Sequence, residues 1–263
     1  MNDIKNAKRI VFKVGTSTLT YENGKMNLRR MAKLCSVLAD LSNSGREILL
    51  VSSGAIAIGL GKLGMIGKPQ DTADRQAVAC VGQCELMFMY DKFFSEYNLP
   101  IGQLLMTKTD VENEKRHKNL VNSFNKMLSL GIIPIINEND SVCIDEIAYG
   151  DNDYLSAVVA VLVNADALVM LTDKDGLFTS NPETDPDATL VTSVPEITDD
   201  IYAIAGGEGT WRGTGGMATK IKGAQLATSH GIETFIINGS SPTDIYKLLD
   251  GRIIGTRFAG RTE

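Results

Sequence analysis

The sequence predicts an α/β fold with a mostly parallel central sheet, and two features lead to this conclusion. Short apolar runs alternate with segments of helical periodicity from end to end, which is the pattern of repeated right-handed βαβ units. The run Glu47–Val51 is continuous in Ile, Leu and Val, as a strand buried on both faces requires. No linker rich in Pro, Ser or Gly and no internal repeat interrupts residues 1–263, so we expect one domain.

The first elements follow from local patterns. The expected first strand is Arg9–Val14, a short apolar run that stops at Gly15. The segment Asn27–Ser44 carries an apolar residue every three or four positions and is expected to be a helix. Glu47–Val51 is the second strand, and the Ser-Gly-Ala after it opens a helix that Ser53 is expected to cap.

The remaining elements continue the alternation. Strands are expected at Ile101–Met106, Ile132–Ile136, Ala167–Leu171 and Glu233–Ile237, with a short final strand near Gly255–Phe258. Helices are expected at Asp74–Tyr97, Lys115–Leu130, Tyr154–Asn164, Gly216–His230 and Pro242–Leu249. We expect Cys143–Ile147 to form a short hairpin and Thr179–Val191, rich in Pro, Asp and Thr, to be a loop.

Composition excludes several classes of protein. The chain carries 26 basic and 32 acidic residues, a formal net charge of −6 and a pI near 5.1, which argues against nucleic acid or an anionic membrane as partner. Its 4 cysteines show no CxxC pair and its 2 histidines lie far apart, so disulfides, a zinc site and a histidine-based triad are disfavoured. No signal peptide or membrane span is evident, and we expect a cytoplasmic protein.

Five polar or glycine-rich clusters follow the expected strands. In open parallel sheets, ligands bind beyond the carboxyl ends of the strands, so this shared position makes each cluster more informative. The clusters are residues 13–17 (Lys-Val-Gly-Thr-Ser), 52–55 (Ser-Ser-Gly-Ala), 137–140 (Asn-Glu-Asn-Asp), 172–176 (Thr-Asp-Lys-Asp-Gly) and 238–239 (Asn-Gly).

Lys13 is unusual because it interrupts an apolar strand. An unpaired buried ammonium is costly, so a buried Lys13 needs an anion opposite it. An edge strand with Lys13 in water is the alternative. The Gly-Thr-Ser at 15–17 favours the first interpretation, because it allows close backbone approach and offers amide and hydroxyl donors to a phosphate.

Two further segments have the chemistry of anion sites. The turn at Ser53 and Gly54 opens a helix, whose free amides bind carboxylate or phosphate as well as accept a cap. The segment Gly213–Lys220 places three glycines and two threonines before a helix, with Lys220 one turn inside it. This segment does not match the P-loop pattern, and the alternative interpretation is a flexible loop. A Rossmann-type dehydrogenase is disfavoured, because no GxGxxG follows the first strand.

Acids and amides crowd the segments 137–140 and 150–153, Gly-Asp-Asn-Asp in the second case. Asx turns would explain each segment by itself. Alternatively, the two segments together form a site that holds a substrate ammonium and a network of lysines. The segment 172–178 is by itself an ordinary turn sequence.

With these clusters in order, the chain resembles the amino acid kinase family over essentially its whole length, and within it the glutamate 5-kinases. The motifs are KVGTS, VSSGAIAIG, INENDSV, GDND, TDKDGLF and GTGGMATK. The resemblance implies a three-layer αβα sandwich. It implies that glutamate binds through Ser53, Gly54, Ala55, Asp140 and Asn152. It implies that ATP contacts Lys13, Gly15, Thr172, Asp173, Thr214, Gly215, Gly216, Met217, Ala218, Thr219 and Lys220. The implied catalytic residues are Lys13, Lys220 and Asp153.

The resemblance also implies an activity: transfer of phosphate from ATP, with Mg²⁺ held mainly by the ATP phosphates, to the γ-carboxylate of L-glutamate, as the first step towards proline. Proline as feedback inhibitor and a homodimer or homotetramer are further expectations, and the C-terminal PUA domain of many such kinases is expected to be absent. The alternatives are another kinase of the fold, such as an aspartate or carbamate kinase, and a non-catalytic nucleotide-binding regulatory protein.

Overall fold

The structure is a computed structural model that describes residues 4–65, 67, 69, 71–142, 152–206 and 216–260. The chain divides into two compact units. Unit 1 comprises Met1–Lys13 and Gly150–Glu263, and unit 2 comprises Val14–Tyr149. Each unit contains parallel strands and covering helices, and unit 1 also has one antiparallel strand pair.

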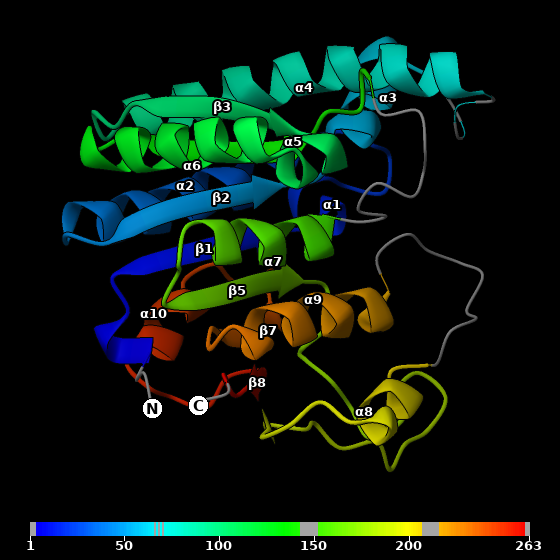
Figure 1. The fold of residues 1–263 in the computed structure, drawn as a ribbon. Coiled ribbons are helices and arrows are strands. Elements are labelled where there is room, and N and C mark those ends of the chain that lie inside the picture. The colour runs from blue at the N-terminus through cyan, green and yellow to red at the C-terminus, as the bar shows by residue number, and fades with distance from the viewer. Residues whose placement is uncertain are drawn as a thin grey trace. The chain divides into compact units, whose positions relative to one another are not determined.

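Unit 2 contains a parallel sheet of three strands in the order β3-β4-β2. The strands are β2 (Glu47–Ser52), β3 (Ile101–Met106) and β4 (Ile133–Glu138). The helices are α1 (Thr16–Leu19), α2 (Leu28–Asn43), α3 (Ala55–Leu63), α4 (Thr72–Ser95), α5 (Lys108–Glu112) and α6 (Glu114–Ser129). Helices α2 and α4 pack on one face of this sheet and α6 on the other, which gives three layers (Figure 1).

Unit 1 carries strands in the order β1-β5-β7-β8-β6. They are β1 (Arg9–Val14, which ends on the first residue of unit 2), β5 (Ala167–Thr172), β6 (Ser193–Val194), β7 (Glu233–Asn238) and β8 (Thr256–Phe258). Strand β7 is parallel to β5 and antiparallel to β8. The helical segments are η1 (Ile4–Asn6), α7 (Asn152–Leu162), α8 (Asp199–Ile204), α9 (Met217–Ser229) and α10 (Asp244–Leu249).

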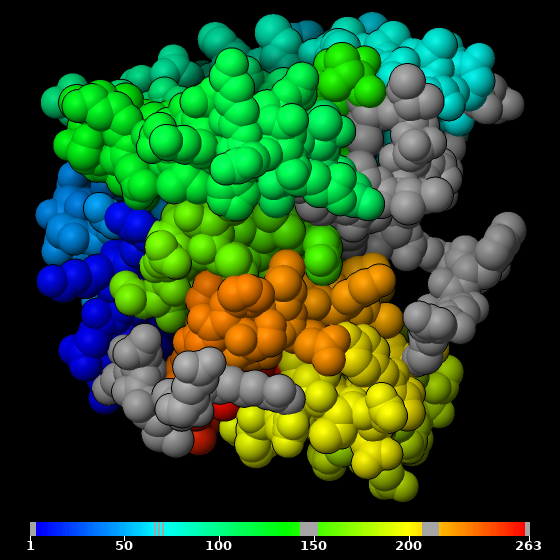
Figure 2. Space-filling model, in the orientation of Figure 1, coloured from blue at the N-terminus to red at the C-terminus, as the bar shows by residue number. Residues whose placement is uncertain are grey.

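Two helix pairs shape the surface of unit 1. Helices α7 and α9 lie side by side in front of β5 and β7 (Figure 1). Figure 2 shows α8, in yellow, beside α9, in orange, and the hydroxyl of Tyr202 donates to Oε1 of Gln225 at 2.7 Å across that contact. The second half of α9, where Gln225 lies, is therefore held by a neighbour on the unit to which it belongs.

The predicted α/β class with a mostly parallel sheet and three layers is confirmed, and most elements lie within two residues of their expected bounds. One local prediction is wrong: the N-cap of α3 is Gly54 rather than Ser53. Gly54 has φ 106°, a left-handed conformation that glycine adopts without a Cβ penalty. The expected loop Thr179–Val191 is confirmed: it contains no helix or strand, and Leu190 forms an isolated bridge with Phe178, just before the loop. The hairpin expected at Cys143–Ile147 lies outside the described residues, and the single domain stays a prediction.

Candidate active site

Three charged side chains of unit 1 meet in its interior. Nζ of Lys13 lies 2.6 Å from Oδ1 of Asp153, and Nζ of Lys220 donates to Oδ2 of the same carboxylate at 2.9 Å. Lys13, Asp153 and Lys220 are 3%, 0% and 6% exposed. The alternative in which Lys13 sits on an edge strand in water is therefore wrong, and the anion opposite it within this chain is Asp153.

Each member of this cluster comes from a different element. Lys13 is the penultimate residue of β1, Asp153 is the second residue of α7, and Lys220 is in the first turn of α9. The hydroxyl of Ser156 donates to the Asp153 carbonyl at 2.6 Å, which holds the first turn of α7. Thr219 donates from Oγ1 to Oδ2 of Asp153 at 3.2 Å. Asp153 thus joins the start of both helices to the end of β1.

Gly223 sets the approach of α9 to α7. A Cβ placed on Gly223 would lie 2.9 Å from the carbonyl oxygen of Asp153 and 3.1 Å from Cε of Met170. Because Gly223 lies one turn after Lys220, this contact fixes how near Lys220 comes to the carboxylate. The sequence offered a weak signal for it, since a glycine inside a helix is unfavourable unless packing requires it.

The electrostatics of the cluster favour an anion. Burial raises the pKa of the Asp153 carboxyl, but the charges of Lys13 and Lys220 and their hydrogen bonds outweigh burial and lower it to about 2. Asp153 is therefore ionised at neutral pH, and two lysines around one carboxylate leave one net positive charge. A net positive charge that is buried from solvent favours the binding of a negatively charged ligand.

The expected nucleotide residues at other positions of unit 1 also lie at element ends. Thr172 ends β5, its hydroxyl donates to Oδ1 of Asp173 at 3.0 Å, and its carbonyl accepts from the amide of Gly239 at 2.7 Å. Gly216 is the N-cap of α9, and Met217, Ala218 and Thr219 form its first turn. No described atom lies within 4 Å of a Cβ built on Gly216. Thr214 and Gly215 lie outside the described residues.

The expected acceptor residues divide between the units. Asn152 opens α7 in unit 1, whereas the other four belong to unit 2. Ser53 donates its amide to the carbonyl of Val14 at 3.0 Å, and Gly54 and Ala55 begin α3. Gly15, expected to contact ATP, is the N-cap of α1 in unit 2.

Asp140 lies two positions after the last residue of β4, Glu138, and is partly buried. Burial raises the pKa of its carboxyl to about 6, with a contribution from the charge of Glu138 that Arg75 offsets in part. A carboxylate whose charge is disfavoured in this way gains most from a cation placed against it. Asp140 has the chemistry to receive an ammonium group.

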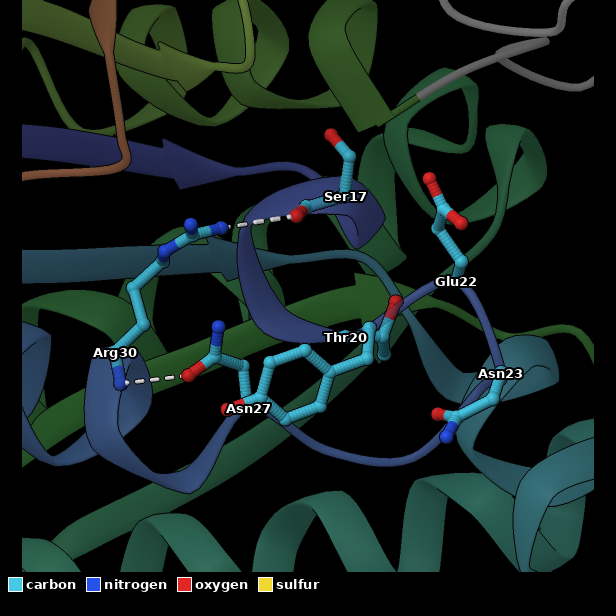
Figure 3. A pocket seen from close by; sticks show the side chains of 7 residues that line it. Ser17, Thr20, Glu22, Asn23, Asn27 and Arg30 are labelled. Carbon is cyan, nitrogen blue, oxygen red and sulfur yellow. Dashed lines mark hydrogen bonds between the residues drawn. The ribbon is translucent and has the colours of Figure 1, made fainter.

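A separate pocket of about 630 Å³ lies in unit 2 beside α1 and the start of α2 (Figure 3). The labelled residues that line it are Ser17, Thr20, Glu22, Asn23, Asn27 and Arg30. The guanidinium of Arg30 donates to the carbonyl of Ser17 at 3.2 Å, and the backbone amide of Arg30 donates to Oδ1 of Asn27 at 3.1 Å. Glu22 balances the charge of Arg30 in the lining, so this pocket offers no net attraction to phosphates.

Two absences concern only the part of the chain that the structure describes. Among those residues, no three His, Cys, Asp or Glu side chains gather in a way that could hold a metal ion. None of the described helices is long and apolar enough to cross a membrane.

The chain is similar to known proteins over most of its length. Residues 8–238 match the model of the amino acid kinase family. A glutamate 5-kinase of Clostridium perfringens is 51% identical over 262 residues, covering 98% of this chain and 97% of the relative. A glutamate 5-kinase of Moorella thermoacetica is 50% identical over 258 residues, covering 98% of this chain and 68% of the relative.

Solved structures support the same fold at low sequence identity. The UMP kinase of Bacillus anthracis superposes with a TM-score of 0.67 at 16% identity, covering 97% of each chain. The T. acidophilum isopentenyl phosphate kinase, solved as a product complex, superposes with a TM-score of 0.65 at 17% identity, covering 95% of this chain and 99% of that one. The family match, the full-length relatives and the shared fold together establish that this chain belongs to the amino acid kinase family.

Proposed function

We propose that this chain is an ATP-dependent glutamate 5-kinase, which transfers the γ-phosphoryl group of ATP to the side-chain carboxylate of L-glutamate. The observation that carries the proposal is the buried cluster in which Asp153 holds Lys13 and Lys220. The choice of glutamate as the acceptor rests on relatives named glutamate 5-kinase, which are about half identical over nearly the whole chain. The product, an acyl phosphate, is the starting point of proline biosynthesis.

The chemistry needs charge compensation more than proton transfer. The γ-carboxylate of glutamate has an unperturbed pKa of about 4.3 and is already a nucleophile at neutral pH. One of its oxygens attacks the γ-phosphorus, the bond from that phosphorus to the β–γ bridging oxygen breaks, and ADP leaves. Because one anion must approach another, preorganised positive charge lowers the barrier.

Lys13 and Lys220 would supply that charge, and Asp153 would act as the residue that orients both. The depressed pKa of Asp153 supports this role, because a permanently ionised carboxylate holds two ammonium groups in fixed positions. Gly15, Thr172, Asp173 and the segment Thr214–Lys220 would complete the nucleotide site with amide and hydroxyl donors.

Mg²⁺, when bound with ATP, would neutralise charge on the phosphates. The donor set that is present, two ammonium groups and a helix N-terminus, suits phosphate oxygens.

The glutamate end would use a different set of groups. Asp140 and Asn152 would recognise the ammonium and α-carboxylate, and the turn Ser53–Ala55 at the start of α3 would offer amide donors. A substrate that lacks the ammonium would leave Asp140 without its partner, so glutarate should be a poor acceptor.

Three further properties belong to this proposal. Proline would act as a feedback inhibitor, since it is the end product of the route that the acyl phosphate enters. The enzyme would form a homodimer or homotetramer. It would act in the cytoplasm, which is consistent with the unpaired thiols of Cys35, Cys80 and Cys84.

The test is ADP release by the purified protein with ATP, Mg²⁺ and L-glutamate, with the acyl phosphate trapped by hydroxylamine. We expect turnover with L-glutamate and none with N-acetylglutamate, L-aspartate or carbamate. Turnover with one of the other acceptors instead would identify another kinase of the fold. ATP binding without turnover on any acceptor would favour a regulatory protein.

A further inference from the structure

Helix α4 is attached by polar contacts to the ends of two neighbouring strands of unit 2. Strands β2 and β4 are parallel, with Val51 opposite Ile136, so the next residues along them are Ser52 and Asn137. Both are buried polar side chains, 0% and 3% exposed. The proposed acceptor segment Ser53–Ala55 follows the first strand end, and Asp140 follows the second.

The end of β2 is held by Tyr90. The Tyr90 hydroxyl lies 2.8 Å from Oγ of Ser52, and Oγ of Ser52 donates to the carbonyl of Ser53 at 3.1 Å. Since Ser52 has one hydroxyl proton, this pattern makes Tyr90 the donor to Ser52. Complete burial raises the pKa of Tyr90, which keeps that proton in place. The contact therefore runs from α4 to the carbonyl of the first acceptor residue.

The end of β4 is held by Gln83, two helical turns before Tyr90. The amide of Glu138 donates to Oδ1 of Asn137 at 2.9 Å, which fixes the orientation of the Asn137 amide group. Nδ2 of Asn137 then donates to Oε1 of Gln83 at 2.9 Å. In the described part of the chain, Nε2 of Gln83 is buried and has no hydrogen-bond partner.

The unsatisfied Nε2 bears on why a glutamine stands at this position. A buried donor without an acceptor lowers stability, so the polar group of Gln83 contributes little to the net stability of the fold. Because one end of this side chain lowers stability, its presence is better explained by what its other end does, which is to hold Asn137.

The backbone of α4 also abuts the start of α3. A Cβ on Gly82 would lie 1.7 Å from the carbonyl oxygen of Ala55, and a Cβ on Gly59 would lie 2.1 Å from the carbonyl oxygen of Val78. The two helices are thus in direct backbone contact at Ala55. Gly82, Gln83 and Tyr90 place one rigid helix against both expected acceptor segments of unit 2.

We infer that Gln83 and Tyr90 are positioning residues for the carboxylate acceptor: they fix the two strand ends from which Ser53–Ala55 and Asp140 approach the substrate. This inference rests on the proposed glutamate kinase activity. It assigns neither residue a contact with glutamate. Its consequence is a selective one, because both residues act on acceptor segments of unit 2, whereas Lys13, Lys220 and Asp153 belong to unit 1.

The experiment compares Gln83→Met and Tyr90→Phe with wild type in the hydroxylamine assay, measuring KM for glutamate, KM for ATP, kcat and Tm. Each replacement keeps the length or ring of the side chain and removes the hydrogen bond. We expect KM for glutamate to rise roughly three- to thirtyfold in each variant, as the loss of one buried hydrogen bond would produce, with KM for ATP within about twofold of wild type.

Matched controls are Gln76→Met, on the same helix, and Tyr97→Phe, just beyond its end. Neither Gln76 nor Tyr97 makes a side-chain hydrogen bond in the described residues, so both variants should behave as wild type. The Tm of Gln83→Met should stay close to that of wild type, because the substitution removes one buried donor without a partner, Nε2 of Gln83, and takes the Gln83 acceptor from another, Nδ2 of Asn137. That combination, stability kept and glutamate affinity lost, is one that a purely structural role cannot give.

The outcomes separate this inference from the proposed function. Wild type that turns over glutamate, with unchanged KM for glutamate in both variants, would reject the positioning roles and leave the activity intact. A rise in KM for ATP equal to that for glutamate would also reject them. Wild type without glutamate turnover would reject both proposals. If Gln83→Met fails to fold, Tyr90→Phe, which loses only a hydroxyl, still decides the question.

Discussion

The ammonium of Lys13 lies 2.6 Å from the carboxylate of Asp153, and neither side chain is in contact with more than a trace of solvent. A strand residue and a helix residue far apart in sequence form this pair, and Lys220 adds a second ammonium to the other carboxylate oxygen. A buried ion pair of this kind contributes little to stability compared with apolar packing, whereas removing one partner is costly. Function is therefore the better explanation for its presence.

Replacing Asp153 by asparagine should abolish most activity and destabilise the fold. Asparagine keeps the shape but leaves Lys13 and Lys220 buried without a counter-charge, which costs about 3–5 kcal/mol when a buried pair is broken. We expect kcat to fall by roughly 10²–10³ or more. Steady-state kinetics and thermal unfolding would measure the two effects, with Asp91→Asn on the exposed side of α4 as control.

Replacing Lys220 by methionine should reduce kcat by roughly 10²–10³, because it removes one preorganised charge from the transferring phosphoryl group. KM for glutamate should change little. The matched control is Lys222→Met, since Lys222 lies on the same helix but is exposed. Turnover by Lys220→Met equal to that of the control would contradict the two-lysine mechanism.

Substituting alanine for Gly223 should lower kcat without changing any charged group. The new methyl would lie 2.9 Å from the carbonyl of Asp153, so α9 must move outward and carry Lys220 with it. Misplacement of a catalytic group by about 1 Å costs on the order of 10² in rate. We expect a loss of roughly ten- to hundredfold in kcat, measured against Lys222→Ala as the control.

The affinity for glutamate should depend on pH through Asp140. Burial, with the charge of Glu138, raises the pKa of this carboxyl to about 6, so the free enzyme carries a neutral Asp140 below that pH. A neutral group cannot pair with the substrate ammonium. KM for glutamate should therefore rise as pH falls below about 6, with a smaller change in KM for ATP.

The matching variant is Asp140→Asn, whose KM for glutamate should be high at every pH and lack this inflection. The ionisation of Asp140 favours glutamate binding but lowers the stability of the fold. Folding raises the pKa of Asp140, so the folded state binds the proton more tightly and Asp140 opposes folding above pH 6. Asp140→Asn should therefore be at least as stable as wild type at pH 7.5, and a marked loss of Tm there would contradict this account.

The stability of the fold at low pH should depend on the ionisation of Asp153. Its pKa is lowered to about 2 in the folded state, below the value of about 3.9 expected in the unfolded chain, so its ionisation stabilises the fold above pH 4. This contribution declines as pH falls from about 4 and is lost below about 2. Wild type should lose stability over that range more steeply than Asp153→Asn does, which chemical unfolding at pH 3 and pH 5 would test.

Much of the fold could be read from the sequence because the long elements carry a periodic apolar pattern. Strand β1 was expected at Arg9–Val14 and is found there, and the expected helix Asn27–Ser44 is α2 with its two caps. Five short elements, η1, α1, α5, β6 and α8, were not predicted. With two to six residues each, they are too short for a period to emerge, and their place is set by what they pack against.

The sequence alone determined the strand-end clusters that hold most of the candidate site residues, since polar residues after an apolar strand are a local pattern. It also pointed to Lys13 as a charge in need of a partner. Tertiary structure alone decided that the partner is Asp153, that Gly223 sets the distance of Lys220, and that Gln83 and Tyr90 hold the ends of β4 and β2. The physical reason is that these contacts join residues on different elements, and periodicity and propensity record which face of an element is buried but not which atoms it meets there.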